Sequence, residues 1–350
     1  MRRSYAVLAV ATIPLVAGCA GPEAMLDAQG PAAGTTATMW WVMFWMGTAI
    51  YVVVMALVGV AFVRARRSKR GRPDHADHAG HDIPAEDDTP VPRRLVLYGG
   101  ILGPLLVLLV LNLVMAPMGA SVNDRGASAD GVDNPTEDVV IEVVAEKFWW
   151  RVTYPELGVT TANEIHLPAQ ERVRLRITSA DVIHSFWVPQ LAGKIDATPG
   201  HTTELVLEAD EPGRYRGRCT EFCGLAHAQM VVWAVAQERE EFDDWVQTQT
   251  QPQPEDISEE LERGREVFFG SSCVYCHAIE GHGPPNTIGP DLTHLASRET
   301  IAGGILDNTR GNLGGWIVDP QSLKPGNLMP GTQIAGAELD ALLDYLESLQ

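Results

Sequence analysis

The sequence predicts a multidomain membrane protein in which two transmembrane helices precede an all-β domain and an all-α domain. Two long apolar runs without charged residues predict the helices, and a series of short alternating runs predicts the β domain. A last unit that opens and closes with helical patterns completes the chain. The 350 residues suffice for two or three domains, and the net charge of -19 argues against nucleic acid as a partner.

The chain begins with an export signal. The stretch "MRRSYAVLAVATIPLVAGC" combines basic residues, a short apolar segment and small residues before Cys19. We expect residues 1–18 to be a signal peptide of the lipoprotein type, with Cys19 lipidated as the mature N-terminus. The alternative is an ordinary signal peptide in which Cys19 is incidental.

Two apolar runs, at 39–63 and 95–118, exceed the roughly 20 residues that a helix needs to cross a bilayer. The loop 64–94 between them contains "RARRSKRGR", whose six basic residues predict a cytoplasmic loop. Both ends of the protein should therefore face outward. Neither run contains histidine, so this chain offers no imidazole for a haem inside the membrane.

The β domain is expected over 138–247. Runs such as "RVRLRITS", "TELVLEA" and "MVVWAVA" alternate apolar and polar residues and are bounded by Pro, Gly or Asp, which is typical of a sandwich or Greek-key barrel. A Pro- and Gln-rich linker at 248–256 then leads to the helical unit at 257–350.

The helical unit contains a haem-attachment motif. In "CVYCH", Cys273 and Cys276 would bind the porphyrin covalently and His277 would be the proximal iron ligand. A redox dithiol is disfavoured because the thioredoxin-like context is absent, and a zinc site is disfavoured because there is no second cysteine pair. Met329 is the one methionine of this unit and is the expected second axial ligand.

A second cluster lies in the β domain. "CTEFCGLAHAQM" places Cys219, Cys223, His227 and Met230 within twelve positions. A disulfide does not explain the histidine and methionine, and zinc has no use for a thioether. A thiol-copper chaperone would need helices between the strands, and a mononuclear blue-copper site needs only one cysteine. Two coppers would use every group if another histidine lay nearby, and His184 in "VIHSFW" supplies it.

These segments closely resemble subunit II of cytochrome c oxidase, which carries a dinuclear copper A centre on a cupredoxin Greek-key fold. The resemblance covers "FWWRVTYP", "HSFWVPQLAGKIDATPG" and "YRGRCTEFCGLAHAQM", together with the two apolar runs. It implies that Cys219 and Cys223 bridge two copper ions. It further implies that His184 and His227 are terminal ligands, that Met230 and the Glu221 carbonyl are weak ligands, and that the Glu221 carboxylate binds magnesium shared with the catalytic subunit.

The helical unit resembles class I cytochromes c over nearly its whole length. Gly264, Phe268, "GPDL" with Pro290, Met329 and Tyr345 carry the likeness. It implies that the Pro290 carbonyl orients His277 and that Gly264 lets the terminal helices cross closely. A cytochrome c domain fused to such a subunit is similar to the caa3 type of haem-copper oxidase.

One departure from the family concerns the route of electrons. Many members have a tryptophan where this chain has Phe148, followed by Trp149 and Trp150. These three aromatic residues are candidates for an electron inlet. The alternative is that they only pack within a strand.

The resemblance implies the electron-receiving subunit of a proton-translocating terminal oxidase. Electrons would pass from one covalent haem c to copper A and then to the haem-copper subunit, where dioxygen is reduced to water; this chain alone would do no oxygen chemistry. Subunits I and III and an external cytochrome c or bc-type complex are the expected partners. The expected location is the bacterial plasma membrane, with the copper and haem domains on its outer face. The alternative is a copper A and haem c subunit of a nitric oxide reductase.

Overall fold

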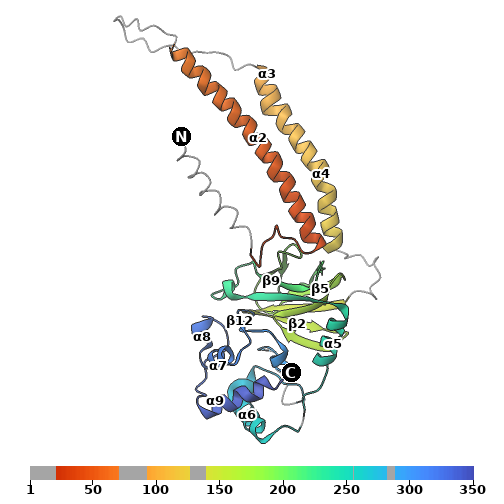
Figure 1. The fold of residues 1–350 in the computed structure, drawn as a ribbon, viewed down its shortest axis with the longest axis vertical. Coiled ribbons are helices and arrows are strands. Elements are labelled where there is room, and N and C mark those ends of the chain that lie inside the picture. The colour runs from red at the N-terminus through yellow and green to blue at the C-terminus, as the bar shows by residue number, and fades with distance from the viewer. Residues whose placement is uncertain (1–20, 71–92, 127–138, 255, 282–287) are drawn as a thin grey trace, which may run out of the picture. The chain divides into compact units, whose positions relative to one another are not determined.

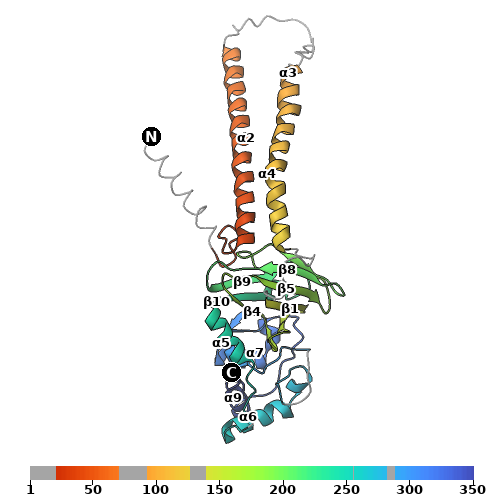
Figure 2. The ribbon, with the colours of Figure 1, turned by 90° about the vertical axis from the view of Figure 1, so that its right-hand side faces the viewer.

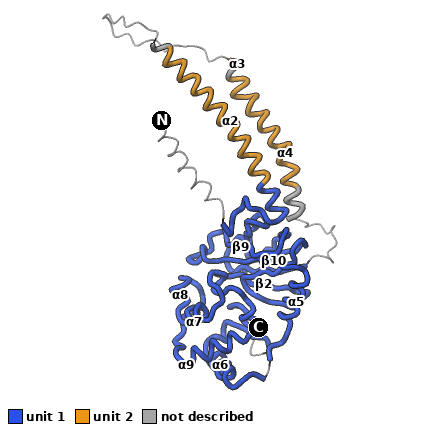
Figure 3. Tube along the Cα trace, in the orientation of Figure 1, with its two compact units in different colours: residues 1–37, 123–350 blue, residues 38–122 orange. Residues whose placement is uncertain are grey.

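The computed structural model describes residues 21–70, 93–126, 139–254, 256–281 and 288–350. The expected signal peptide, Cys19 and most of the predicted cytoplasmic loop lie outside these residues. The chain divides into two compact units, one made of residues 1–37 with 123–350 and one of residues 38–122 (Figure 3). Each is described by itself.

The smaller unit consists of long apolar helices that run alongside one another in Figures 1 and 2. The first, α2 (Pro31–Arg70), begins in the larger unit. The second combines α3 (Arg93–Leu95), a π-helical stretch η1 (Val96–Leu102) and α4 (Gly103–Gly126). Their apolar segments have mean hydropathies of 2.4 and 2.3 and are not buried against protein, so both are long and apolar enough to cross a membrane.

The larger unit contains a β-sandwich of two five-stranded sheets. The first sheet has the order β3-β2-β1-β5-β8 and the second β4-β10-β9-β6-β7. Within them, β1 pairs with β5 and β4 with β10 in parallel, and the other pairs are antiparallel. The strands are β1 (Val139–Glu146), β2 (Trp149–Tyr154), β3 (Val159–Ala162), β4 (Glu164–Pro168), β5 (Val173–Ser179), β6 (His184–Trp187), β7 (Ile195–Ala197), β8 (Thr203–Leu207), β9 (Gly213–Cys219) and β10 (Val231–Gln237).

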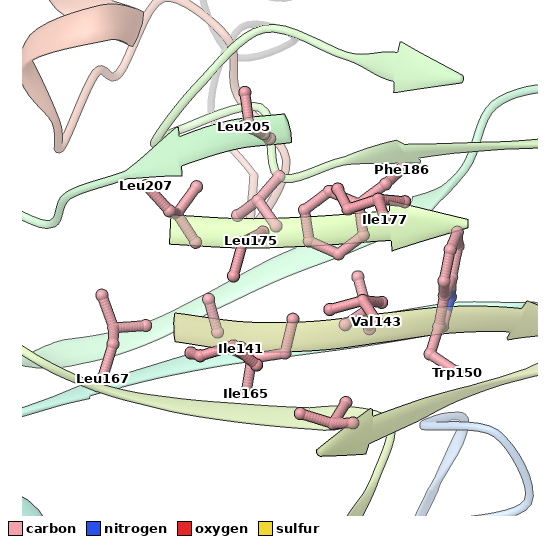
Figure 4. Packing of buried hydrophobic residues seen from close by; sticks show 14 of the residues in the cluster. Ile141, Val143, Trp150, Ile165, Leu167, Leu175, Ile177, Phe186, Leu205 and Leu207 are labelled. Atoms are coloured by element: carbon pink, nitrogen blue, oxygen red, sulfur yellow. The ribbon is translucent and has the colours of Figure 1, made fainter. Parts of the chain in front are cut away.

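Alternation along the strands builds the core between the sheets. In β5, Val173, Leu175 and Ile177 are fully buried, and Figure 4 shows Leu175 and Ile177 beside Ile141 and Val143 of the neighbouring strand. Arg176, on the opposite side of the strand, is exposed, and its Nε lies 3.5 Å from Glu204 of β8. The predicted in-and-out pattern of this strand is therefore confirmed.

The N-terminal segment 21–37 packs on the sandwich. The Gln29 amide donates to the Gln190 carbonyl at 2.7 Å, and the Gln29 carbonyl accepts from the Asp210 amide at 2.8 Å. Glu23 forms ion pairs with Arg216 and Arg218 of β9. Gly30 is required here, because a Cβ at this position would lie 2.4 Å from a main-chain oxygen of the sandwich.

The C-terminal part of the larger unit is helical. After α5 (Arg239–Gln249), which packs on the sandwich, come α6 (Glu259–Gly270), η3 (Ser272–Tyr275), η4 (Leu295–Ser297), β11 (Thr300–Ile301), β12 (Leu306–Asp307), α7 (Arg310–Val318), α8 (Pro320–Leu323) and α9 (Ala337–Glu347). Helices α6 and α9 cross at Gly264, where a Cβ would lie 2.0 Å from the Ala341 carbonyl oxygen. The close crossing implied by the resemblance to cytochromes c is present.

Candidate functional site: two adjoining centres

Five predicted side chains converge at one end of the sandwich. His184 begins β6, Cys219 ends β9, and the other three lie in the loop and 3₁₀ turn η2 (His227–Gln229) that connect β9 to β10. The distances are 3.8 Å from Cys219 Sγ to His184 Nδ1, 3.9 Å between the two Sγ atoms, 3.6 Å from Cys223 Sγ to His227 Nδ1, and 4.0 Å from Cys223 Sγ to Met230 Sδ. Each cysteine thus faces one imidazole nitrogen.

The thiols are buried free cysteines and their acidities diverge. Hydrogen bonding with Cys223, assisted by His184, lowers the pKa of Cys219 to about 3. The same pairing, together with burial, raises the pKa of Cys223. One thiolate is therefore already favoured without a cation, and a soft metal ion would stabilise the second.

The donor set fits copper. Thiolate, imidazole and thioether ligands together favour copper over zinc, and Met230 is fully buried with its sulfur in the cluster. The Glu221 carbonyl oxygen lies 3.2 Å from Cys219 Sγ, whereas the rest of Glu221 is exposed. The backbone of this residue is therefore beside the cluster while its carboxylate is free to face outward.

Asp181 is a functional candidate that sequence reasoning missed. Its Oδ1 lies 2.8 Å from His184 Nε2, so the carboxylate fixes the ring with Nδ1 towards Cys219. Burial opposes the charge of Asp181, but hydrogen bonds from His184 and from the Val182 and Lys147 amides keep its pKa below the ordinary value. The only sequence signal for this role was that Asp181 lies three residues before His184.

A cavity of about 390 Å³ lies in the helical part of this unit. Its lining includes all four residues predicted for the haem: Cys273, Cys276, His277 and Met329. The rest is mostly apolar, with Leu295, Leu313, Ile317, Leu342 and Leu346 among the contributors. Two free thiols, an imidazole and a thioether around an apolar cavity suit a covalently bound haem.

His277 is oriented by the main chain. Its Nδ1 donates to the Pro290 carbonyl at 2.7 Å, which leaves Nε2 available for iron. Burial lowers the pKa of His277, which favours the neutral ring that binds a metal. Gly289 is needed beside the ring, since a Cβ there would lie 2.7 Å from an imidazole carbon.

The three aromatic candidates are placed differently. Phe148 and Trp149 line the haem cavity, although both precede or begin a strand of the sandwich. The Phe148 ring also lies against Gly224, next to Cys223, where a Cβ would be 2.9 Å from its Cζ. Trp150 is instead a fully buried core residue, with its ring centroid 6.2 Å from that of His184. Phe148 therefore lies between the haem cavity and the loop that carries Cys223.

The sandwich and the helical part are joined by buried polar groups that the sequence did not single out. Glu164 is 1% exposed and accepts hydrogen bonds from the Thr300 amide and hydroxyl at 2.7 and 2.5 Å. Arg298 is buried and donates to Thr161 Oγ1 at 3.2 Å. Lys324 donates across the same boundary to Phe148, and burial lowers its pKa to about 7.

Two sequence families match the chain. The family described as "Cytochrome C oxidase subunit II, periplasmic domain" matches residues 140–237, and the family described as "Cytochrome c" matches residues 261–350. The matches cover the sandwich and the helical part respectively.

Relatives span most of the chain. Cytochrome c oxidase subunit 2 of Alkalihalophilus pseudofirmus is 40% identical over 71% of each chain. The protein of the same name from Bacillus sp. (strain PS3) is 31% identical over 69% of this chain and 72% of its own. Among solved structures, the periplasmic domain of subunit II of cytochrome oxidase from Bradyrhizobium japonicum is 31% identical, covering 33% of this chain and 95% of its own, with a TM-score of 0.32.

Proposed function

Because the chain belongs to the cytochrome c oxidase subunit 2 family, we propose that it receives electrons at its own haem c and passes them to a copper A centre. It is a subunit of a haem-copper oxidoreductase, with an electron-transfer role beside the catalytic subunit I. From copper A the electrons would continue to that subunit, which reduces dioxygen to water. The relatives are named oxidases, which favours this reading over a nitric oxide reductase.

The position of Phe148 between the haem cavity and the loop that carries Cys223 is the observation that carries the proposed route. Phe148 is one of the residues that line the haem cavity, and its ring lies against Gly224 in the loop that contains Cys223. Phe148 is only 5% exposed, so an external donor cannot dock directly on it. The haem domain then takes the place of a docked donor, and an external cytochrome c or bc-type complex would deliver electrons to that domain.

We assign the ligands residue by residue. Cys273 and Cys276 would attach the haem, and His277 and Met329 would bind its iron. Two copper ions would be held by Cys219, Cys223, His184, His227, Met230 and the Glu221 carbonyl. With the metals bound, both centres would supply one-electron oxidation and reduction.

The remaining assignments concern the surroundings. The exposed Glu221 carboxylate is the proposed ligand of a magnesium ion shared with subunit I, and subunit III is a further expected partner. We propose a bacterial plasma membrane protein with a signal peptide over 1–18 and lipidation at Cys19. The copper domain at 138–247 and the haem domain at 257–350 would then lie on the outer face.

Metal analysis of the purified full-length chain tests the proposal. We expect about two copper ions for each covalent haem iron and a mixed-valence copper signal in electron paramagnetic resonance. The change Cys219→Ser should abolish the copper signal and leave the haem spectrum intact. One copper per haem, or zinc in place of copper, would contradict the assignment.

A further inference from the structure

Lys324 lies in an unusual position for an ammonium group. It follows α8, only 2% of it is exposed, and it forms no ion pair with any carboxylate in the described part of the chain. A buried amino group is stable only where hydrogen bonds replace those it loses to water, so the hydrogen bonds of Lys324 account for its placement. Nζ donates to the Phe148 carbonyl at 2.7 Å and to the Ala302 carbonyl at 2.9 Å.

These two carbonyls belong to different domains. Phe148 lies between β1 and β2 of the sandwich, and Ala302 lies in the turn between β11 and β12 of the haem domain. Both residues line the haem cavity, as does Lys324 itself. One ammonium therefore holds the two walls of the cavity together.

The turn that Lys324 binds also contacts the copper loop. The Gly303 carbonyl accepts from the Val231 amide at 3.1 Å, and Val231 directly follows Met230. The next residue, Gly304, accepts from Trp233 Nε1 at 3.0 Å. The turn Ala302–Gly304 thus extends from the haem cavity to the residue after a proposed copper ligand.

Gly303 allows Lys324, the turn and Phe148 to approach one another closely. A Cβ at Gly303 would lie 2.1 Å from Lys324 Nζ and 2.8 Å from the Phe148 carbonyl oxygen. Its φ of +75° also disfavours any other residue. The ammonium, the turn and Phe148 are in contact because this position has no side chain.

We propose that Lys324 is a positioning residue for electron transfer, which sets the gap between the haem cavity and the copper ligands by fastening the turn Ala302–Gly304 to Phe148. The inference rests on the proposed function. Electron tunnelling slows steeply as the gap between carriers widens, so a small separation of the two walls would slow the transfer without changing either centre.

The test uses the full chain with both centres loaded. Lys324→Met keeps the length of the side chain and removes both hydrogen bonds, and Lys194→Met is the matched control because Lys194 is exposed on the sandwich. The haem is photoreduced by a laser flash, and its reoxidation is followed together with the copper absorption. We expect transfer in Lys324→Met to slow by roughly tenfold or more. The variant also removes a positive charge from the cavity wall, so both redox potentials are measured, and the slowing should exceed what their change accounts for.

Gly303→Ala provides a second variant. Its methyl group would push the ammonium from Phe148, so it should slow transfer in the same way even if Lys324→Met fails to fold. A wild-type rate of electron transfer in folded Lys324→Met, or in Gly303→Ala, overturns the inference. The same holds if a variant only unfolds at a lower temperature and transfers electrons at the wild-type rate. A wild-type chain whose haem cannot reduce its copper centre would instead overturn the proposed function.

Discussion

Met329 is the thioether of the haem cavity and the residue whose replacement should act most locally. A methionine opposite histidine raises the potential of a haem, so Met329→His should lower it by on the order of 0.1 V. Covalent attachment through Cys273 and Cys276 should persist. Redox titration of the haem absorption measures the shift, and Met55→Leu in α2 is a control that should leave the potential unchanged. An unaltered potential in Met329→His would exclude Met329 as a ligand.

Asp181 contacts His184, one of the proposed copper ligands. Asp181 Oδ1 accepts from the Val182 amide and faces His184, and Oδ2 accepts from the Lys147 amide. Asp181→Asn keeps only one oxygen, so one of these contacts is lost together with the charge that supports the imidazole. Removing such a support typically weakens metal binding by about 10–100-fold, and we expect a loss in that range. Competition with a copper chelator measures it, with the exposed Asp196→Asn as control. Equal copper retention in both variants would show that Asp181 does not support the site.

The sequence singles out the proposed metal ligands more readily than the residues that would support them. Cys219, His227 and Met230 are recognisable because a thiol, an imidazole and a thioether at short offsets serve few other purposes. Lys324 and Glu164 have no such pattern, because their roles depend on burial between domains that are far apart along the chain. The residues next to them in the sequence do not indicate that they are buried.

At the scale of helices, the crossing of α6 and α9 depends on Gly264. Gly264→Ala would place a methyl group 2.0 Å from the Ala341 carbonyl oxygen and 2.6 Å from Tyr345 Cβ. Since backbone must move to relieve this, we expect a loss of about 3 kcal/mol or more in the free energy of unfolding of the haem domain. Denaturant unfolding followed by haem absorption measures it. Gly270→Ala, in the same helix with open space around it, should cost far less; equal losses would contradict the prediction.

Strand β4 is tied to the haem domain through Glu164. Burial tends to raise the pKa of this carboxyl, but interactions with His166 and Thr300 outweigh burial and hold the pKa below its ordinary value of 4.5. The stabilisation is therefore complete above that value and is lost as the pH falls through the folded-state pKa. Glu164→Gln should cost about 1–3 kcal/mol at pH 7.

The difference between wild type and Glu164→Gln should shrink as the solution is acidified below the ordinary pKa of the carboxyl. Unfolding curves at neutral and acidic pH measure it, and the exposed Glu240→Gln should show little effect at either. A difference that grows on acidification would have the wrong sign and would refute the role of the ionised carboxylate.

At the scale of the whole chain, the proposed electron donor and the proposed acceptor are parts of one molecule. Electron transfer from haem to copper should therefore be independent of protein concentration and should change less than about twofold with salt, because no charged surfaces need to meet in solution. Flash photoreduction at several concentrations and ionic strengths measures this. A rate proportional to concentration would mean that electrons pass between molecules instead.

The segment 21–37 has a consequence for the order in which the molecule is completed. Gln29 forms hydrogen bonds with residues 190 and 210, and Glu23 forms ion pairs with Arg216 and Arg218. The earliest described part of the chain is therefore held by residues that are synthesised much later. Contacts of such long separation form only after the intervening chain has been synthesised and folded. The segment 21–37 would thus be among the last parts of the chain to fold, because its final contacts form only once β9 is in place.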